Sequence, residues 1–147
     1  MSSSSSKVEK IGLSMTDLAN KVVWITGASS GIGKALAQTA AQQNTKLILS
    51  GRRTDALEAL ATDLPVDCLV LPFEVTDYDV LAEKVDEAWA WQGRVDVLVN
   101  NAGISQRCLA IDAKPEVYTD LINVDLIAPI WLTQLQLARM AEAGGGH

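Results

Sequence analysis

The sequence is poor in the residues that build metal sites and lacks the long apolar runs that build membrane spans. It has one histidine, His147, and two cysteines, Cys68 and Cys108. This predicts no histidine- or cysteine-based metal site and two reduced thiols, as in a cytoplasmic protein. No apolar run approaches the ~20 residues of a membrane span, so no membrane partner is expected. Acidic residues outnumber basic ones, 18 to 12, which argues against a general nucleic-acid partner.

What the sequence does have is enough apolar material for one folded domain. Its 147 residues are 48% hydrophobic, which fits a buried core and excludes a disordered chain. Residues 1–20 begin with five serines and lack the apolar core of a signal peptide. They are predicted to form a flexible N-terminal arm, and residues 21–147 the domain.

The stretch Thr26–Gly33, TGASSGIG, joins an apolar strand to an alanine-rich helix. Gly27 permits a tight turn out of the strand, which a Cβ would hinder. Gly31 leaves room for a diphosphate beside the backbone, and Gly33 allows the helix to pack close to the strand. The unpaired N–H groups at the start of the helix then face an anionic ligand with the positive end of the helix dipole.

The rest of the chain repeats this strand–helix order. Strands are predicted over Lys21–Thr26, Lys46–Ser50, Val66–Leu71 and Val95–Asn100. Helices are predicted over Gly31–Gln43, over Thr54–Asp63 with Thr54 as N-cap, from Thr76 or Asp77 to Trp91, and from Pro115 to Ala143 with a kink at Pro129. Such crossovers predict an α/β fold with a doubly wound, Rossmann-like parallel sheet in the order 3-2-1-4, with helices on both faces. The ligand crevice is expected at the carboxyl ends of strands 1 and 4, where the order reverses.

Two motifs resemble those of the short-chain dehydrogenase/reductase family. One is TGASSGIG, whose glycine spacing is GxxxGxG rather than the general GxGxxG, and the other is Asn100-Asn101-Ala102-Gly103 after the fourth strand. Two ordinary glycine turns in an α/β protein are the alternative interpretation. The resemblance implies an oxidoreductase that moves hydride between a nicotinamide cofactor and an alcohol or carbonyl carbon of a small-molecule substrate.

The resemblance also assigns residues to the cofactor's phosphates and riboses. Ser29, Ser30 and Ile32 are expected to contact the ribose and diphosphate through backbone N–H and hydroxyl groups. The alternative role for the two serines, helix capping, uses the same groups. Asn101, Ala102 and Gly103 are expected along the ribose side of the cofactor, whereas Asn100 is expected to brace the sheet.

Glu74-Val75 follows the third strand, where the family usually has Asp-Val beside the adenine. Glu74 departs from that pattern by one methylene. It is either an acceptor for the adenine amino group or a surface carboxylate.

Arg52 and Arg53 predict which nicotinamide cofactor is bound. NAD-selective enzymes usually carry a carboxylate after the second strand, where this chain has Gly51 followed by the two arginines. A guanidinium pairs well with the extra 2′-phosphate of NADP, so NADP is predicted over NAD. A solvated basic turn is the alternative.

The catalytic residues of the family are largely missing. Its helix asparagine aligns with Asp125 in Val124-Asp125-Leu126, and neither tyrosine, Tyr78 or Tyr118, begins a Tyr-x-x-x-Lys pair. We therefore expect a chain truncated after the fourth strand and the following long helix, inactive by itself, with the fourth strand as an unpaired apolar edge. A nucleotide-binding or interaction module without catalysis is the alternative. In the family the long helix commonly joins a subunit interface, which is compatible with a homo-oligomer.

Overall fold

The structure is a computed structural model, and it describes residues 17–105 and 107–147. Most of the predicted N-terminal arm, residues 1–16, lies outside the described residues. Residues 17–20 contact the domain, because the Asn20 N–H donates to the carbonyl of Asn44 (3.0 Å) and the Leu18 N–H donates to the Gln43 side chain.

Four short parallel strands form the sheet at the centre of the molecule. They are β1 (Val22–Ile25), β2 (Lys46–Leu49), β3 (Cys68–Val70) and β4 (Val97–Val99). Their order is β3-β2-β1-β4, which confirms the prediction. Each strand is shorter than predicted, since hydrophobicity reports burial rather than pairing. Leu71 and Val95, for example, are buried in the core although both lie outside the strands.

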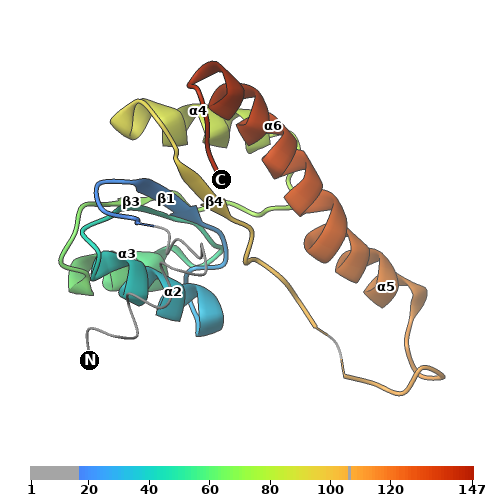
Figure 1. The fold of residues 1–147 in the computed structure, drawn as a ribbon. Coiled ribbons are helices and arrows are strands. Elements are labelled where there is room, and N and C mark those ends of the chain that lie inside the picture. Colours follow the sequence, from blue (N-terminus) through green and yellow to red (C-terminus); the bar gives the residue numbers. More distant parts are fainter. Residues whose placement is uncertain (1–16, 106) are drawn as a thin grey trace, which may run out of the picture.

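Helices cover both faces of the sheet, as predicted. Helices α2 (Gly31–Ala41) and α3 (Thr54–Asp63) lie on one face, and α4 (Leu81–Gln92) and α6 (Ala128–Glu142) lie on the other (Figure 1). The side chains of strand β1 pack against the helices on both faces of the sheet. Val23 and Ile25 pack in the cluster with α2 and α3, whereas Val22 and Trp24 pack in the cluster with α4 and α6. Alternating side chains of a strand buried on both faces explain its continuous apolar sequence.

Two helix starts differ from the sequence prediction. Helix α4 begins at Leu81 rather than at Thr76 or Asp77, because the preceding residues form turns in which the Asp77 N–H donates to the Glu74 carbonyl (3.0 Å). Thr54 is the first residue of α3 rather than its N-cap, and Arg53 occupies the cap position.

The long helical pattern after Pro115 contains a π-helical turn. Helix α5 (Pro115–Ile122) continues through η1 (Asn123–Ile127) into α6, and the Ala128 N–H donates to the carbonyl of Asn123, five residues earlier. Pro129, the second residue of α6, has no N–H to give to the preceding turn. The structure therefore has a widened turn before the proline, whereas the sequence predicts a kink at the proline itself.

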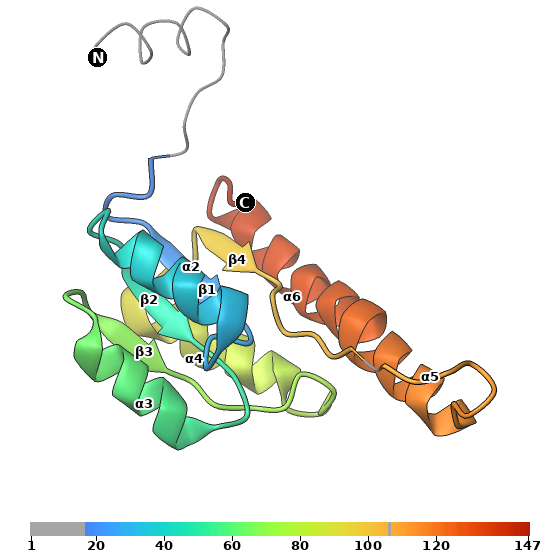
Figure 2. The same ribbon diagram turned by 90° about the horizontal axis from the view of Figure 1, so that it is seen from below.

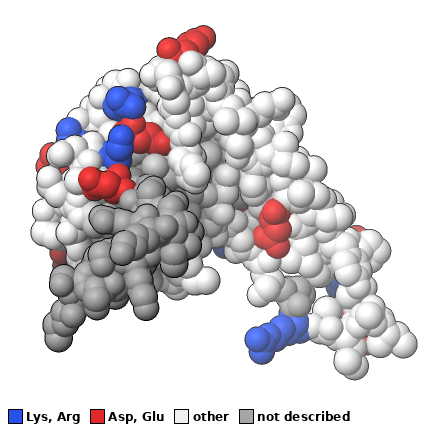
Figure 3. Space-filling view, in the orientation of Figure 1, with Lys and Arg blue, Asp and Glu red and all other residues white. Residues whose placement is uncertain are grey.

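Helix α5 and the loop before it extend away from the sheet (Figures 1 and 2). Figure 3 shows few charged residues on the visible surface of helix α5 and of the loop before it. Residues 115–142 have the length and hydropathy of a membrane-spanning helix, a combination that core helices of soluble proteins also have. Part of this apolar character is used inside the fold, where Ala128, Leu132 and Met140 are buried. The expectation of no membrane partner stays a prediction.

The outer edge of β4 is partly paired, which corrects the expectation of an unpaired edge. The His147 N–H donates to the Asp96 carbonyl, and the Leu98 N–H donates to the His147 carbonyl, both at 2.9 Å. Gly144 and Gly145 have φ of +93° and +152°, and these left-handed conformations turn the chain back from α6 to the sheet.

Candidate functional site

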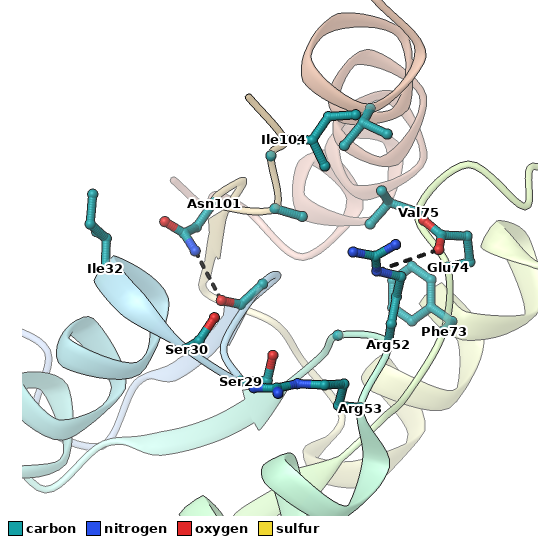
Figure 4. A pocket seen from close by; sticks show the side chains of 15 residues that line it. Ser29, Ser30, Ile32, Arg52, Arg53, Phe73, Glu74, Val75, Asn101 and Ile104 are labelled. Carbon is teal, nitrogen blue, oxygen red and sulfur yellow. Dashed lines mark hydrogen bonds and ion pairs between the residues drawn. The ribbon is translucent and has the colours of Figure 1, made fainter. Parts of the chain in front are cut away.

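A cavity of about 620 Å³ lies at the carboxyl ends of the four strands (Figure 4). The loops after β1 and β2 contribute Gly27, Ser29, Ser30, Ile32, Gly51, Arg52 and Arg53. The loops after β3 and β4, with η1, contribute Phe73, Glu74, Val75, Asn101, Ala102, Gly103, Ile104 and Val124. The cavity thus collects every predicted cofactor-binding residue except Gly31 and Gly33, at the predicted crevice.

Gly27, Gly31 and Gly33 play three different parts in the turn after β1. Gly27 has a φ of +64°, and a Cβ on it would lie 2.8 Å from the Cα of Ala102. A Cβ on Gly33 would overlap the Gly27 carbonyl and the Asn101 amide, so Gly33 allows close packing against the turn and the β4 loop rather than against β1. Gly31 has a φ of +56° with open space around it, which leaves its backbone accessible to a ligand.

Helix α2 presents its N-terminus to the cavity. Ser30 is the N-cap residue, and in the described chain no side chain caps the helix. The first-turn N–H groups, which have no partner inside the helix, are therefore available to an anion. Ser29, Ser30 and Ile32 line the cavity beside them. The alternative capping role of the Ser30 hydroxyl is not used here.

Thr26 joins the β1 and β4 loops, a role that the sequence analysis did not assign to it. Its buried hydroxyl accepts from the N–H groups of Asn101 (3.1 Å) and Ala102 (3.0 Å). The Asn101 amide in turn donates to the Gly27 carbonyl at 3.1 Å. The partners of Thr26 are more than 70 residues away in the sequence, so local patterns do not predict this bridge. The one related signal is that Thr26 is the last residue of the predicted first strand.

The turn after β2 places two guanidinium groups at the cavity. Arg52 and Arg53 both line it, and in Figure 4 Arg53 extends toward Ser29 whereas Arg52 extends toward Glu74. Arg52 Nε lies 3.7 Å from Glu74 Oε2. Gly51 brings no side chain, and so no carboxylate, to the turn after β2, and a Cβ on it would lie 3.5 Å from Ser29 Oγ.

The wall after β3 is aromatic. Phe73, which lines the cavity, packs edge-to-face on Trp24 with ring centroids 6.1 Å apart. The indole of Trp24 is fully buried, and its Nε1 donates to Ser50 Oγ (2.8 Å). Trp24 therefore lies directly behind the cavity wall, close enough to report on a ligand by fluorescence.

Asp125 lies outside the cavity and fixes one of its walls. Its Oδ1 accepts a hydrogen bond from the Ile104 N–H (2.8 Å), and a Cβ on Gly103 would lie 3.2 Å from the same oxygen. The carboxylate at the family's asparagine position thus holds a backbone group of the β4 loop. Asn100, expected to brace the sheet, donates instead to Thr133 Oγ1 of α6 (2.8 Å).

Asp125→Ala is expected to lower the free energy of unfolding by about 1 kcal/mol, since it removes an exposed hydrogen bond to a charged acceptor. Asp125→Asn is expected to stay within a few tenths of a kcal/mol (~0.3), because its side-chain oxygen still accepts. Urea unfolding followed by circular dichroism measures both. Equal losses in the two variants would contradict this role of the carboxylate oxygen.

Cys68 does not line the cavity. Among the residues that the structure describes, no group of histidine, cysteine and acidic side chains is arranged to hold a metal ion. Burial, with a smaller contribution from Asp67, raises the pKa of the Cys68 thiol to about 11. Cys68 therefore stays protonated near neutral pH and is a poor nucleophile.

The parallel sheet in the order β3-β2-β1-β4, with the glycine turn and an uncapped helix at its switch point, defines a Rossmann-like α/β protein. The family model for short chain dehydrogenases matches residues 21–147. The chain belongs to the short-chain dehydrogenase/reductase family, as its two motifs suggested.

Individual relatives agree with this assignment. The chain is 37% identical over 137 residues to human "Dehydrogenase/reductase SDR family member 7", covering 88% of this chain and 40% of the relative. It is 35% identical to the bovine family member 7B, covering 87% and 42%. The chain therefore spans less than half the length of these two relatives.

Solved structures share the fold. A short-chain dehydrogenase from Streptomyces avermitilis matches with a TM-score of 0.80 at 36% identity, covering 90% of this chain and 48% of that one. A metagenomic short-chain oxidoreductase in complex with NADP matches with a TM-score of 0.83 at 30% identity, covering 90% and 62%.

Proposed function

We propose that this chain binds NADP(H), in preference to NAD(H), as the cofactor-binding part of an oxidoreductase that acts on an alcohol or carbonyl group. The observation that carries the proposal is the pairing of an uncapped helix N-terminus with two arginines and Gly51 around one cavity. The NADP complex of the metagenomic relative supports the choice of cofactor.

The residues around the cavity fit such a cofactor in kind and in place. The α2 N-terminus and Ser29 and Ser30 supply donors for a diphosphate, and the small Ala102 and Gly103 let a ribose lie against the backbone. Arg52 and Arg53 supply charge for a 2′-phosphate. The nicotinamide ring supplies or accepts hydride when the cofactor is bound, and this chain's contribution is to hold and orient it.

A fluorescence titration tests the proposal. Trp24 lies behind the Phe73 wall, so bound NADPH should quench tryptophan emission and gain sensitised emission of its own. NADPH is expected to bind at least about tenfold more tightly than NADH, since each phosphate–guanidinium hydrogen bond contributes about 1.5–3 kcal/mol.

Arg52→Gln with Arg53→Gln is expected to remove this preference and leave NADH binding within about twofold, because NADH has no 2′-phosphate to lose. Lys114→Gln removes a positive charge from the exposed N-cap of α5 and should change neither affinity. Equal affinities of the unaltered chain for the two cofactors would contradict the NADP assignment. No binding of either would overturn the proposed function.

A further inference from the structure

Glu74 and Arg52 face each other because their backbones run side by side beyond the sheet. The Leu71 N–H donates to the Leu49 carbonyl (3.0 Å), and the Phe73 N–H donates to the Gly51 carbonyl (3.1 Å). These bonds continue the β2–β3 pairing past the ends of both strands. They keep Glu74, the residue after Phe73, next to the turn that carries Arg52, and the Arg52 Nε lies 3.7 Å from the Glu74 carboxylate (Figure 4).

This ion pair uses only one edge of the guanidinium and is open to solvent. Arg52 contributes its Nε to the pair, and the two side chains are 70% and 42% exposed. Exposed pairs of this kind are weak, with a stabilisation between about 0.2 and 1 kcal/mol. Glu74 nevertheless brings a negative charge into the same cavity that Arg52 and Arg53 make positive.

We propose that Glu74 is a specificity-determining residue, whose carboxylate competes with the cofactor's 2′-phosphate for Arg52 and so limits the preference for NADP(H) over NAD(H). This inference rests on the proposed function. A 2′-phosphate carries up to about two negative charges. It either displaces Glu74 from Arg52, at the loss of the pair, or binds beside it and is repelled by the carboxylate. In both cases Glu74 weakens the binding of the phosphorylated cofactor alone.

The adenine contact expected from the sequence makes a different prediction. NADP and NAD share the adenine ring, so a carboxylate that serves the adenine amino group affects both cofactors equally. The ratio of the two affinities therefore separates competition for Arg52 from an adenine contact. A supporting role, in which Glu74 orients Arg52 toward the phosphate, predicts weaker NADPH binding once the carboxylate is removed.

The test is a titration of the whole chain and of its Glu74→Gln variant with NADPH and with NADH. Glu74→Gln is expected to tighten NADPH binding about threefold, the factor that corresponds to a weak exposed pair. NADH binding should stay the same, and the gain should vanish when Arg52→Gln is combined with Glu74→Gln. Glu142→Gln removes the same charge at the far end of α6 and should leave both affinities unaltered.

Several results would overturn the inference. Competition is excluded if the unaltered chain binds NADPH and the Glu74→Gln variant binds it equally or more weakly. An equal change in the affinities for NADPH and NADH excludes it as well. A gain that survives in the Arg52→Gln background means that Glu74 acts without Arg52. In each of these cases the proposed function stands. If the unaltered chain binds neither NADPH nor NADH, the proposed function and this inference are both overturned.

Discussion

Gly51→Asp is expected to weaken NADPH binding about 100-fold while leaving NADH binding equal or stronger. The structure allows this side chain, because a Cβ on Gly51 would meet Ser29 Oγ at 3.5 Å and Leu57 Cδ2 at 3.7 Å, which are ordinary contacts. Gly51 is also not among the residues with positive φ, so a side chain brings no backbone strain. The new carboxylate would extend from the cavity wall beside Ser29, where the proposed phosphate site lies.

The size of this effect follows from the charges. Two unit charges of like sign 4 Å apart repel by about 4 kcal/mol at an effective dielectric constant of 20. A 100-fold loss corresponds to only about 2.7 kcal/mol, so it leaves room for solvent screening. NADH has a ribose 2′-hydroxyl in place of the phosphate, and a carboxylate accepts a hydrogen bond from it.

Two control variants separate charge from size at position 51. Gly51→Ala adds the Cβ alone, and Gly51→Asn adds a side chain of the same shape as aspartate without its charge. Both are expected to bind NADPH within about fivefold of the unaltered chain, which is under 1 kcal/mol. Fluorescence titration measures all three. An asparagine variant as impaired as the aspartate variant would show that bulk, not charge, controls the site.

Gly51 and the arginines illustrate what the sequence could predict. The fold follows from local patterns, because the apolar runs, the glycine turn and the strand–helix alternation each depend on neighbouring residues. Since parallel strands end at one edge of the sheet, the loops at their ends had to meet. The cavity lining therefore contains the predicted residues other than Gly31 and Gly33, although no local pattern gives the direction of a side chain such as Arg52.

The features that were missed depend on contacts between distant segments. The bridge from Thr26 to Asn101 joins loops that the sequence separates by more than 70 residues. The π turn at Asn123–Ile127 lies before Pro129, whereas the sequence predicted a kink at the proline itself. The ion pair between Glu74 and Arg52 likewise has no local signal in the sequence, because the alignment of the β2 and β3 loops is a tertiary feature.

Gly33→Ala is expected to lower the free energy of unfolding by about 3 kcal/mol, at the upper end of the typical cost of overpacking, and to abolish NADPH binding. The added Cβ would overlap the Gly27 carbonyl and the Asn101 amide nitrogen, which hydrogen bond to each other at 3.1 Å. The carbonyl is backbone and cannot swing aside like the end of a flexible side chain. Relieving the overlap therefore requires α2 to move away from the turn, and its N-terminal donors would move with it.

Gly31→Ala is the matched control, because it lies two residues away and adds the same single methyl group. A Cβ there meets nothing within 4 Å, so its cost to folding is the left-handed φ of +56°, about 1–2 kcal/mol. Its methyl group would also stand where the diphosphate is expected to approach, so the comparison of stabilities is the decisive one. Urea unfolding and NADPH titration of both variants give the comparison. If Gly33→Ala proved as stable as the unaltered chain, or less damaging than Gly31→Ala, close packing of α2 against the Gly27 turn would not be what positions the donors. A larger loss at Gly33 in both measurements would tie cofactor binding to that packing, because Gly33 itself does not line the cavity.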